Sequence, residues 1–390
     1  MARTLPDQAY AAYALARSIE MFAGLLGGGF VLQALLKLGS EKPSRETSSA
    51  ANAASILTLG FSLLSGGLLL AFSGSLNSFY GDIDLTGIIP AIVLASVTGA
   101  IAFIPRNLLL TRLGTAKVMQ ADVLSFLIRG GIVGYLILTG KLTGAVQVLH
   151  ATALANAGAF LLSGWNARHC LDLSAGVSRK AFKKVSGFAI YSLGTSLAGF
   201  VYTRTDILML GKLAPPEDVA AYGASRALTS MVVMVAAAAN MVLLPVLSRD
   251  WSEGRRDRLP GRTLRAILYV QLIQLPVVAA LVLFPRWVID TVYQGRYTEN
   301  WPILAILGGL SLIKPFGSLF STAGSAMGKP QYSFWSVLTS AGVNVFLNIL
   351  LIPSMGGEGA AWATAAAVFA GAVTVVILTM SRWNRGTEGR

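Results

Sequence analysis

Apolar runs of about twenty residues recur along the whole chain, separated by short polar connections. Such a run has the length that an α-helix needs to cross the hydrocarbon core of a bilayer, which is about 30 Å thick. Only 13% of the 390 residues are charged, about half the share found in a soluble domain. A soluble helical protein would need polar faces on most of its helices, and these runs do not provide them. The chain is therefore predicted to be an all-α polytopic membrane protein.

Proline, glycine and charge clusters divide the chain into about eleven predicted transmembrane helices. The predicted spans are 11–36, 51–74, 86–108, 118–139, 144–166, 184–210, 220–247, 264–286, 301–323, 331–352 and 358–381.

Lys and Arg gather in alternate connections between these spans: 37–50, 109–117, 167–183, 248–263, the connection around Lys329, and the C-terminal tail. Basic loops stay on the cytoplasmic side of a membrane. The alternation therefore predicts a multi-pass protein of the cytoplasmic membrane with a cytoplasmic C-terminus. Because the number of spans is odd, the N-terminus is expected outside.

Several classes of function are disfavoured by the residue counts. The single cysteine, Cys170, excludes a disulfide framework, and two histidines are too few for a histidine-based metal site. The net charge of +13 is explained by basic cytoplasmic loops better than by nucleic-acid binding. The chain also lacks a Gly-x-x-x-x-Gly-Lys-Ser/Thr loop for ATP. No cofactor, metal, nucleic-acid partner or enzymatic activity is expected.

An internal repeat appears when the chain is shifted by about 209 residues. "RTLPDQAYAAYALAR" (Arg3–Arg17) then lies over "KLAPPEDVAAYGASR" (Lys212–Arg226), with proline, tyrosine and arginine in register. Under the same shift the second to fifth spans fall on the eighth to eleventh. An even number of spans separates the copies, so both run in the same direction, as in transporters whose halves are related by an axis along the membrane normal.

The repeat predicts two pseudo-symmetric lobes. Residues 1–166 would form an N-terminal lobe of five helices, 167–183 a cytoplasmic linker, and 184–390 a C-terminal lobe of six helices. The helix that precedes the second copy has no counterpart before the first copy. We therefore expect that the first helix of a usual set of twelve is missing from this sequence.

Ionisable side chains inside the apolar spans are the candidate functional residues, because an intramembrane charge costs a few kcal/mol and is usually retained for a purpose. Basic residues predominate, and arginine binds phosphate oxygens bidentately. The sequence thus indicates a cavity that attracts an anion. The candidates for binding an anionic head group are Arg17, Arg129, Arg204, Arg226 and Lys314, and the candidates for ion coupling or ion pairing are Glu20 and Asp206.

Simpler roles remain open for several of these residues. Arg17 and Arg226 lie about 9 Å inside their helices, close enough to snorkel to the outer interface. Asp206 either neutralises Arg204 or, because an i,i+2 pair points to different helix faces, serves another helix. Lys314 precedes Pro315 and is also placed to donate to carbonyls freed at a proline kink.

Uncharged polar residues receive structural interpretations. Aromatic residues near predicted span ends are interpreted as interface anchors, namely Tyr13, Tyr80, Tyr222, Tyr293 and Trp301. The amide pairs Asn344/Asn348 and Gln271/Gln274 each share a helix face and are expected to join helices, with sugar contacts as the alternative.

The stretch "YTRTDILMLGKLAPPEDVAAYGASRAL" resembles the polysaccharide transporter branch of the multidrug/oligosaccharidyl-lipid/polysaccharide superfamily, the O-antigen flippases. That branch typically shows an Arg-x-Asp near the outer end of its seventh helix, followed by a loop that Gly211, Glu217 and Tyr222 fit. "RTLPDQAYAAYALA" is similar to the corresponding loop of the first lobe. "ILGGLSLIKPFGSLFSTAGSAMGKP" is similar to the tenth-helix region of the family.

The resemblance implies two helical lobes that rock between inward- and outward-facing states around a central cavity. The implied substrate is a lipid-pyrophosphate-linked oligosaccharide, moved from the inner to the outer leaflet. Implied partners are this substrate, membrane lipids and other polysaccharide-assembly proteins. Arg17 and Arg226 would then face one cavity. The main rival is a cation-coupled exporter of drugs or organic cations from the same superfamily, which would use Asp206 or Glu20.

Overall fold

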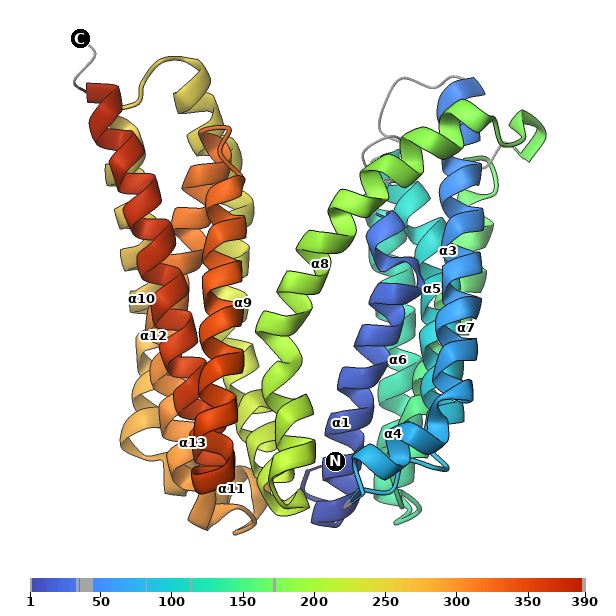
Figure 1. Ribbon diagram of the computed structural model, residues 1–390, viewed down its shortest axis with the longest axis vertical. Coiled ribbons are helices and arrows are strands. Elements are labelled where there is room, and N and C mark those ends of the chain that lie inside the picture. Colours follow the sequence, from blue (N-terminus) through green and yellow to red (C-terminus); the bar gives the residue numbers. More distant parts are fainter. Residues whose placement is uncertain are drawn as a thin grey trace. The chain divides into compact units, whose positions relative to one another are not determined.

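A computed structural model describes residues 2–32, 35, 45–81, 83–112, 114–170 and 173–387 (Figure 1). Every regular element within these ranges is a helix. The predicted 37–50 loop is described only from residue 45 onward, and residues 388–390 of the predicted C-terminal tail also lie outside the described residues. Ten of the described helices are long and apolar enough to cross a membrane, which agrees with the predicted all-α membrane class.

The chain divides into two compact units, residues 3–197 and 198–390, with the division inside one long helix. The helices of the first unit are α1 (Asp7–Gly24), continued by a π-helical segment (Leu25–Gly29), α3 (Arg45–Ala71), α4 (Ser73–Phe79), α5 (Ile89–Thr111), α6 (Thr115–Leu138) and α7 (Ala145–Ala167). A 3-10 turn (Leu173–Ala175) precedes α8 (Arg179–Leu213), which contributes to both units.

The second unit continues with α9 (Pro216–Ser252), α10 (Arg258–Leu283), α11 (Pro285–Tyr293), a 3-10 turn (Thr298–Asn300), α12 (Trp301–Ala326) and α13 (Gln331–Thr387). In this unit α12 packs against α9, α10 and α13. In the first unit α5 has the same central position and packs against α1, α3 and α7. Since 209 residues separate the predicted repeats, α5 and α12 are the equivalent helices.

The last helix, α13, is a hairpin of two spans. Gly356 interrupts the helix with φ 52° and ψ −129°, a backbone conformation that glycine adopts readily because it has no Cβ atom. The two halves lie side by side and antiparallel, because Ser336 Oγ donates to the Gly371 carbonyl at 2.7 Å and Asn344 Nδ2 donates to Thr364 Oγ1 at 3.4 Å. Counted as two spans, α13 brings the candidate crossings of the described residues to the predicted eleven.

Helix starts support the predicted repeat. Pro6 immediately precedes α1 and Pro215 immediately precedes α9, so both helices begin at equivalent positions of the two copies. Proline before a helix start is favourable because the first N–H groups of a helix have no internal partner. The predicted lobe boundaries remain a prediction.

Two short helices were not foreseen in the sequence. α4 follows α3, and α11 follows α10, so they occupy equivalent places in the two copies. Exposed aromatic side chains lie in or next to both, namely Phe72, Phe79, Phe284 and Trp287. Helices of one to three turns produce no twenty-residue apolar run, which explains why hydropathy missed them.

Close packing shapes the first span. Gly28 has φ 103°, and a Cβ atom there would lie 2.8 Å from the Cα atom of Thr58 on α3. Only glycine fits such an approach without displacing the neighbouring backbone. The resulting kink lets α1 and α3 pack closely, and Phe30, Ala53 and Ala54 continue the apolar core there.

Candidate functional site

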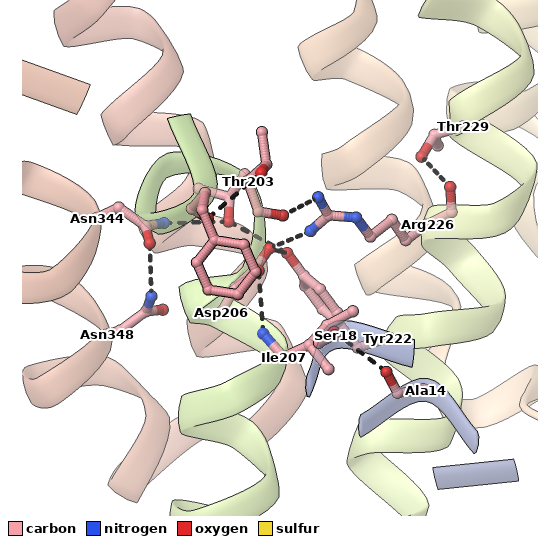
Figure 2. A network of polar contacts seen from close by, with 12 residues as sticks. Ala14, Ser18, Thr203, Asp206, Ile207, Tyr222, Arg226, Thr229, Asn344 and Asn348 are labelled. Atoms are coloured by element: carbon pink, nitrogen blue, oxygen red, sulfur yellow. Dashed lines mark hydrogen bonds and ion pairs between the residues drawn. The ribbon is translucent and has the colours of Figure 1, made fainter. Parts of the chain in front are cut away.

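Asp206 on α8 is the centre of a buried polar network in the second unit (Figure 2). Its Oδ2 atom accepts hydrogen bonds from the hydroxyl of Tyr222 and from Nη1 of Arg226, both on α9. Its Oδ1 atom accepts a 3.0 Å hydrogen bond from the backbone N–H of Ile207. Asp206 is only 2% exposed. The sequence left two roles open for Asp206, and the structure shows the one in which Asp206 bonds to residues of another helix, α9.

Hydrogen-bond donors are aligned toward this carboxylate from α13. Asn348 Nδ2 donates to Asn344 Oδ1 at 3.0 Å, and Asn344 Nδ2 donates to Thr364 Oγ1. The hydroxyls of Thr364 and Tyr222 are 3.2 Å apart, and the bond from Tyr222 to Asp206 leaves Thr364 as the donor. Each donor polarises the next acceptor, so the series stabilises negative charge on Asp206 at membrane depth.

The expected helix-joining role of the asparagines is confirmed, since the bond from Asn344 to Thr364 connects the two halves of α13. Both asparagines are buried. Their amides are thus used inside the helix bundle of the second unit.

The guanidinium of Arg226 is held from two directions. Nη1 lies 2.5 Å from Asp206 Oδ2, and Nη2 donates to the backbone carbonyl of Thr203, so both contacts come from α8. The side chain keeps 27% of its surface exposed. A guanidinium carries about five N–H donors. The donors of Arg226 that Asp206 and Thr203 do not engage can bind a further oxygen ligand. Arg226 is therefore positioned rather than freely extended toward an interface.

Lys314 on α12 lies close enough to Arg226 and Asp206 for their charges to act on its ammonium group. It is half-buried and makes no hydrogen bond or ion pair with a described residue. Arg226 and Lys314 carry two positive charges, and Asp206 carries one negative charge. Their sum favours an anion in this part of the second unit.

The backbone carbonyl that Pro315 leaves without a helical partner is bonded by a side chain of another helix. Pro315 lacks the N–H that would bond to the Ser311 carbonyl four residues earlier. Gln274 Nε2 on α10 donates to that carbonyl at 2.8 Å, and Gln271 Nε2 donates to the Leu312 carbonyl at 2.6 Å. The prediction that these glutamines join helices is confirmed. The alternative in which Lys314 serves the freed carbonyl is wrong, because Gln274 does.

Arg204, two residues before Asp206, is half-buried on α8. Spacing places it on a different face of the helix from Asp206. It belongs to the same unit as Arg226 and Lys314, and its role in binding an anion remains a prediction.

Candidates in the first unit have a different arrangement. Arg17 Nη1 donates to Glu20 within α1, and Glu20 is buried. Arg17 thus finds its carboxylate three residues along its own helix, whereas Arg226 finds its partner on a neighbouring helix. Arg129 on α6 is half-buried and has no ion pair among the described residues.

The sequence also missed a pair between helices of the first unit. Arg106 Nε and Nη2 on α5 donate to the two carboxylate oxygens of Asp122 on α6, at 2.9 and 2.8 Å. Such fork-to-fork pairing is the strongest form of this contact. Sixteen residues separate the two partners, so no helical spacing could reveal them.

Interpreting the tyrosines as interface anchors was wrong for Tyr222, which is 0% exposed and bonded to Asp206. Tyr293 on α11 is also buried, and its hydroxyl donates to the Ala224 carbonyl on α9 at 2.9 Å. Burial raises the pKa of Tyr293 to about 12, so its hydroxyl stays a neutral donor. Tyr222 lies one helical turn before Arg226, and this spacing was the available signal that the two share a helix face.

Known proteins resemble this chain in sequence. A family model described as "Polysaccharide biosynthesis protein" matches residues 1–302. The "Probable low-salt glycan biosynthesis flippase Agl15" of Haloferax volcanii is 22% identical over 196 residues. That match takes in 50% of this chain and 42% of the relative, so it spans less than half the length of that protein.

Solved structures share the fold. An inward-facing multidrug resistance MATE family transporter superimposes with a TM-score of 0.77 at 16% identity, over 98% of this chain and 94% of that one. The lipid II flippase MurJ in an inward closed conformation superimposes with a TM-score of 0.70 at 18% identity, over 95% and 81%. At these identities the likeness establishes the arrangement of helices.

The family model covers well over half of the chain, and the resemblance found in the sequence is thereby confirmed. The chain belongs to the polysaccharide biosynthesis protein family.

Proposed function

We propose that the protein is a flippase that moves a lipid-pyrophosphate-linked oligosaccharide across the cytoplasmic membrane by alternating access. Family membership and the similarity to a glycan flippase support a lipid-linked glycan as substrate. In this proposal the pyrophosphate binds to basic residues inside the spans, and the lipid chain stays in the bilayer. The C-terminus is cytoplasmic, in keeping with the basic tail.

The observation that carries the proposal is that two basic side chains, Arg226 and Lys314, lie within electrostatic range of each other. These residues lie on α9 and α12, which pack against each other, and their charges interact. An exposed part of Arg226 offers directed N–H donors to phosphate oxygens, and Lys314 supplies a second positive charge without a competing partner among the described residues. We assign the contact with the pyrophosphate to this pair.

Arg204, Arg17 and Arg129 are further candidates for the head group. Arg204 shares the second unit with Arg226 and Lys314, so it is the next residue to test. Arg17 is engaged by Glu20 and would have to exchange that carboxylate for phosphate. Arg129 has no such competitor in the described part of the chain.

The occupied state of Asp206 weighs against the rival function, export of organic cations. Both carboxylate oxygens already accept hydrogen bonds, and Arg226 supplies the neutralising charge. A cationic substrate would have to displace a positioned arginine from a buried carboxylate, which is expensive. Asp206 and Glu20 are therefore assigned to ion pairing with Arg226 and Arg17.

Transport in proteoliposomes tests the proposal. The substrate is a short-chain lipid-pyrophosphate disaccharide with a fluorescent sugar, and its appearance in the outer leaflet is read by a membrane-impermeant quencher. We expect Arg226→Gln and Lys314→Gln each to reduce the initial rate at least tenfold. Arg258→Gln is the matched control, because Arg258 is exposed at the start of α10.

Wild-type rates in both Arg226→Gln and Lys314→Gln, at equal protein amounts, would overturn the anion site. Loss of organic-cation efflux in Asp206→Asn, with efflux retained in Arg226→Gln, would establish the rival exporter instead. A protein that moves neither class of substrate would contradict both functions.

A further inference from the structure

A shallow groove with a volume of about 420 Å³ lies on the first unit between the end of α5 and the first half of α6. Leu110 contributes from α5, and Thr115, Met119, Asp122 and Phe126 contribute from α6. Thr115 and Phe126 are eleven residues apart, which corresponds to about 16 Å along a helix. This length matches the depth of one leaflet of hydrocarbon, about 15 Å.

The groove faces outward and is mainly apolar. Only 11% of the most apolar 18-residue stretch of α6 is buried inside the protein. This is the smallest share among the candidate spans of the described residues. Met119 and Phe126 are 62% and 66% exposed. Apolar side chains so exposed on a membrane helix are placed to contact lipid or another protein.

The one carboxylate in the groove wall is neutralised. Asp122 receives two hydrogen bonds from Arg106, so the wall presents a closed ion pair instead of a free negative charge. An acidic head group is therefore not repelled from this groove.

Positive charge is concentrated where the groove begins. Arg112 directly follows α5 and Lys117 lies in the first turn of α6, and both side chains are exposed. The groove enters the apolar region directly below this turn, at Thr115 and Met119. Two cations at the membrane surface above a leaflet-deep apolar groove are complementary to a lipid with an anionic head group.

We propose that this groove binds one acyl chain of an anionic glycerophospholipid, whose phosphate is held by Arg112 and Lys117. The site is separate from the proposed substrate contact at Arg226 and Lys314. Its occupant is a lipid of the surrounding bilayer and not the transported glycan. Binding here is independent of transport, so the two proposals can fail separately.

Photolabelling in nanodiscs tests the site. Wild-type protein is placed in phosphatidylcholine nanodiscs that contain a trace of phosphatidylglycerol with a diazirine on one acyl chain. Labelled peptides are then mapped by mass spectrometry. We expect labelling centred on residues 115–126, reduced about tenfold or more in Arg112→Gln/Lys117→Gln. Labelling by a diazirine phosphatidylcholine should be weak at these residues and unchanged by the double substitution.

Two further variants sharpen the result. Arg256→Gln/Arg258→Gln removes two exposed cations from the α9–α10 connection and should leave labelling of 115–126 unchanged. Met119→Trp fills the groove and should reduce labelling while both head-group cations remain. Equal labelling by the two lipids, or no effect of Arg112→Gln/Lys117→Gln in folded protein, would overturn the proposal. If labelling disappears as the protein self-associates, the groove would be an interface with a second copy of the chain, and the lipid-binding proposal would also be overturned.

Discussion

Arg226 on α9 forms an ion pair with Asp206 on α8, and the charges of both residues act on the ammonium group of Lys314 on α12. In a buried ion pair, the attraction between the two charges is largely offset by the cost of removing both charges from water. Removal of one member is therefore costly, while removal of both is tolerated better. The pair serves to position a guanidinium that keeps donors for a ligand.

Asp206→Asn tests this relationship through stability. The substitution leaves Arg226 without its counter-charge, and we expect a loss of about 3 kcal/mol, seen as a lower thermal midpoint in detergent. Asp206→Asn/Arg226→Gln should recover most of that stability and still fail to transport. An unchanged midpoint in Asp206→Asn would show that the pair does not stabilise the second unit.

Tyr222→Phe removes the hydroxyl through which Thr364 is connected to Asp206. A buried acceptor that loses its donor costs about 1–3 kcal/mol, while the ring still fills its space on α9. We expect a lower thermal midpoint than in the wild type. Tyr135→Phe is the matched control, because the Tyr135 side chain is exposed on α6, and its effect should stay within about 0.5 kcal/mol. Equal effects of the two changes would contradict the role assigned to Tyr222.

Gln274 and Pro315 should be coupled energetically, since Gln274 bonds to the carbonyl that Pro315 leaves free. Gln274→Leu is expected to cost about 1–3 kcal/mol in the wild-type background. Pro315→Ala restores an N–H for the Ser311 carbonyl, so Gln274→Leu should cost clearly less in that background. The double-mutant cycle of thermal midpoints measures the coupling, and strictly additive effects would show that the two residues act separately.

The sequence predicted the membrane helices well because hydropathy and length act over twenty residues and tolerate local detail. It predicted the repeat because Pro6 and Pro215 occupy equivalent positions before equivalent helices. It also identified Arg226, Asp206 and Lys314 as candidates, since an ionisable residue inside an apolar run is conspicuous in one dimension.

The partners of these residues were beyond sequence reasoning. Asp206 meets Arg226 because α8 and α9 are packed together, and Arg106 meets Asp122 across α5 and α6. Tyr222 looked like an interface anchor because its place near a span end was visible, whereas its burial against Asp206 depended on helix packing. Short helices such as α11 produce too little apolar sequence to be detected.

Asp250 is buried near the C-terminal end of α9, the end that is predicted to face the cytoplasm. It is 1% exposed and lies 3.2 Å from Arg255 Nε and 2.9 Å from Arg262 Nε, so it connects the turn after α9 to the first turns of α10. Asp250→Asn removes the negative charge that contacts both arginines, while Arg255 keeps its ion pair with Glu253. We expect a loss of about 3 kcal/mol and local opening of the Arg-rich turn.

Limited trypsin digestion measures that opening, because the turn contains Arg255, Arg256 and Arg258 as cleavage sites. Cleavage in the turn should be at least tenfold faster in Asp250→Asn than in the wild type, since protease cuts the transiently opened segment. Arg249→Gln is the matched control: it breaks an i,i+4 pair with Glu253 at the protein surface, and exposed ion pairs contribute little to stability. If Arg249→Gln accelerates cleavage as much as Asp250→Asn does, the buried carboxylate has no special part in holding the turn.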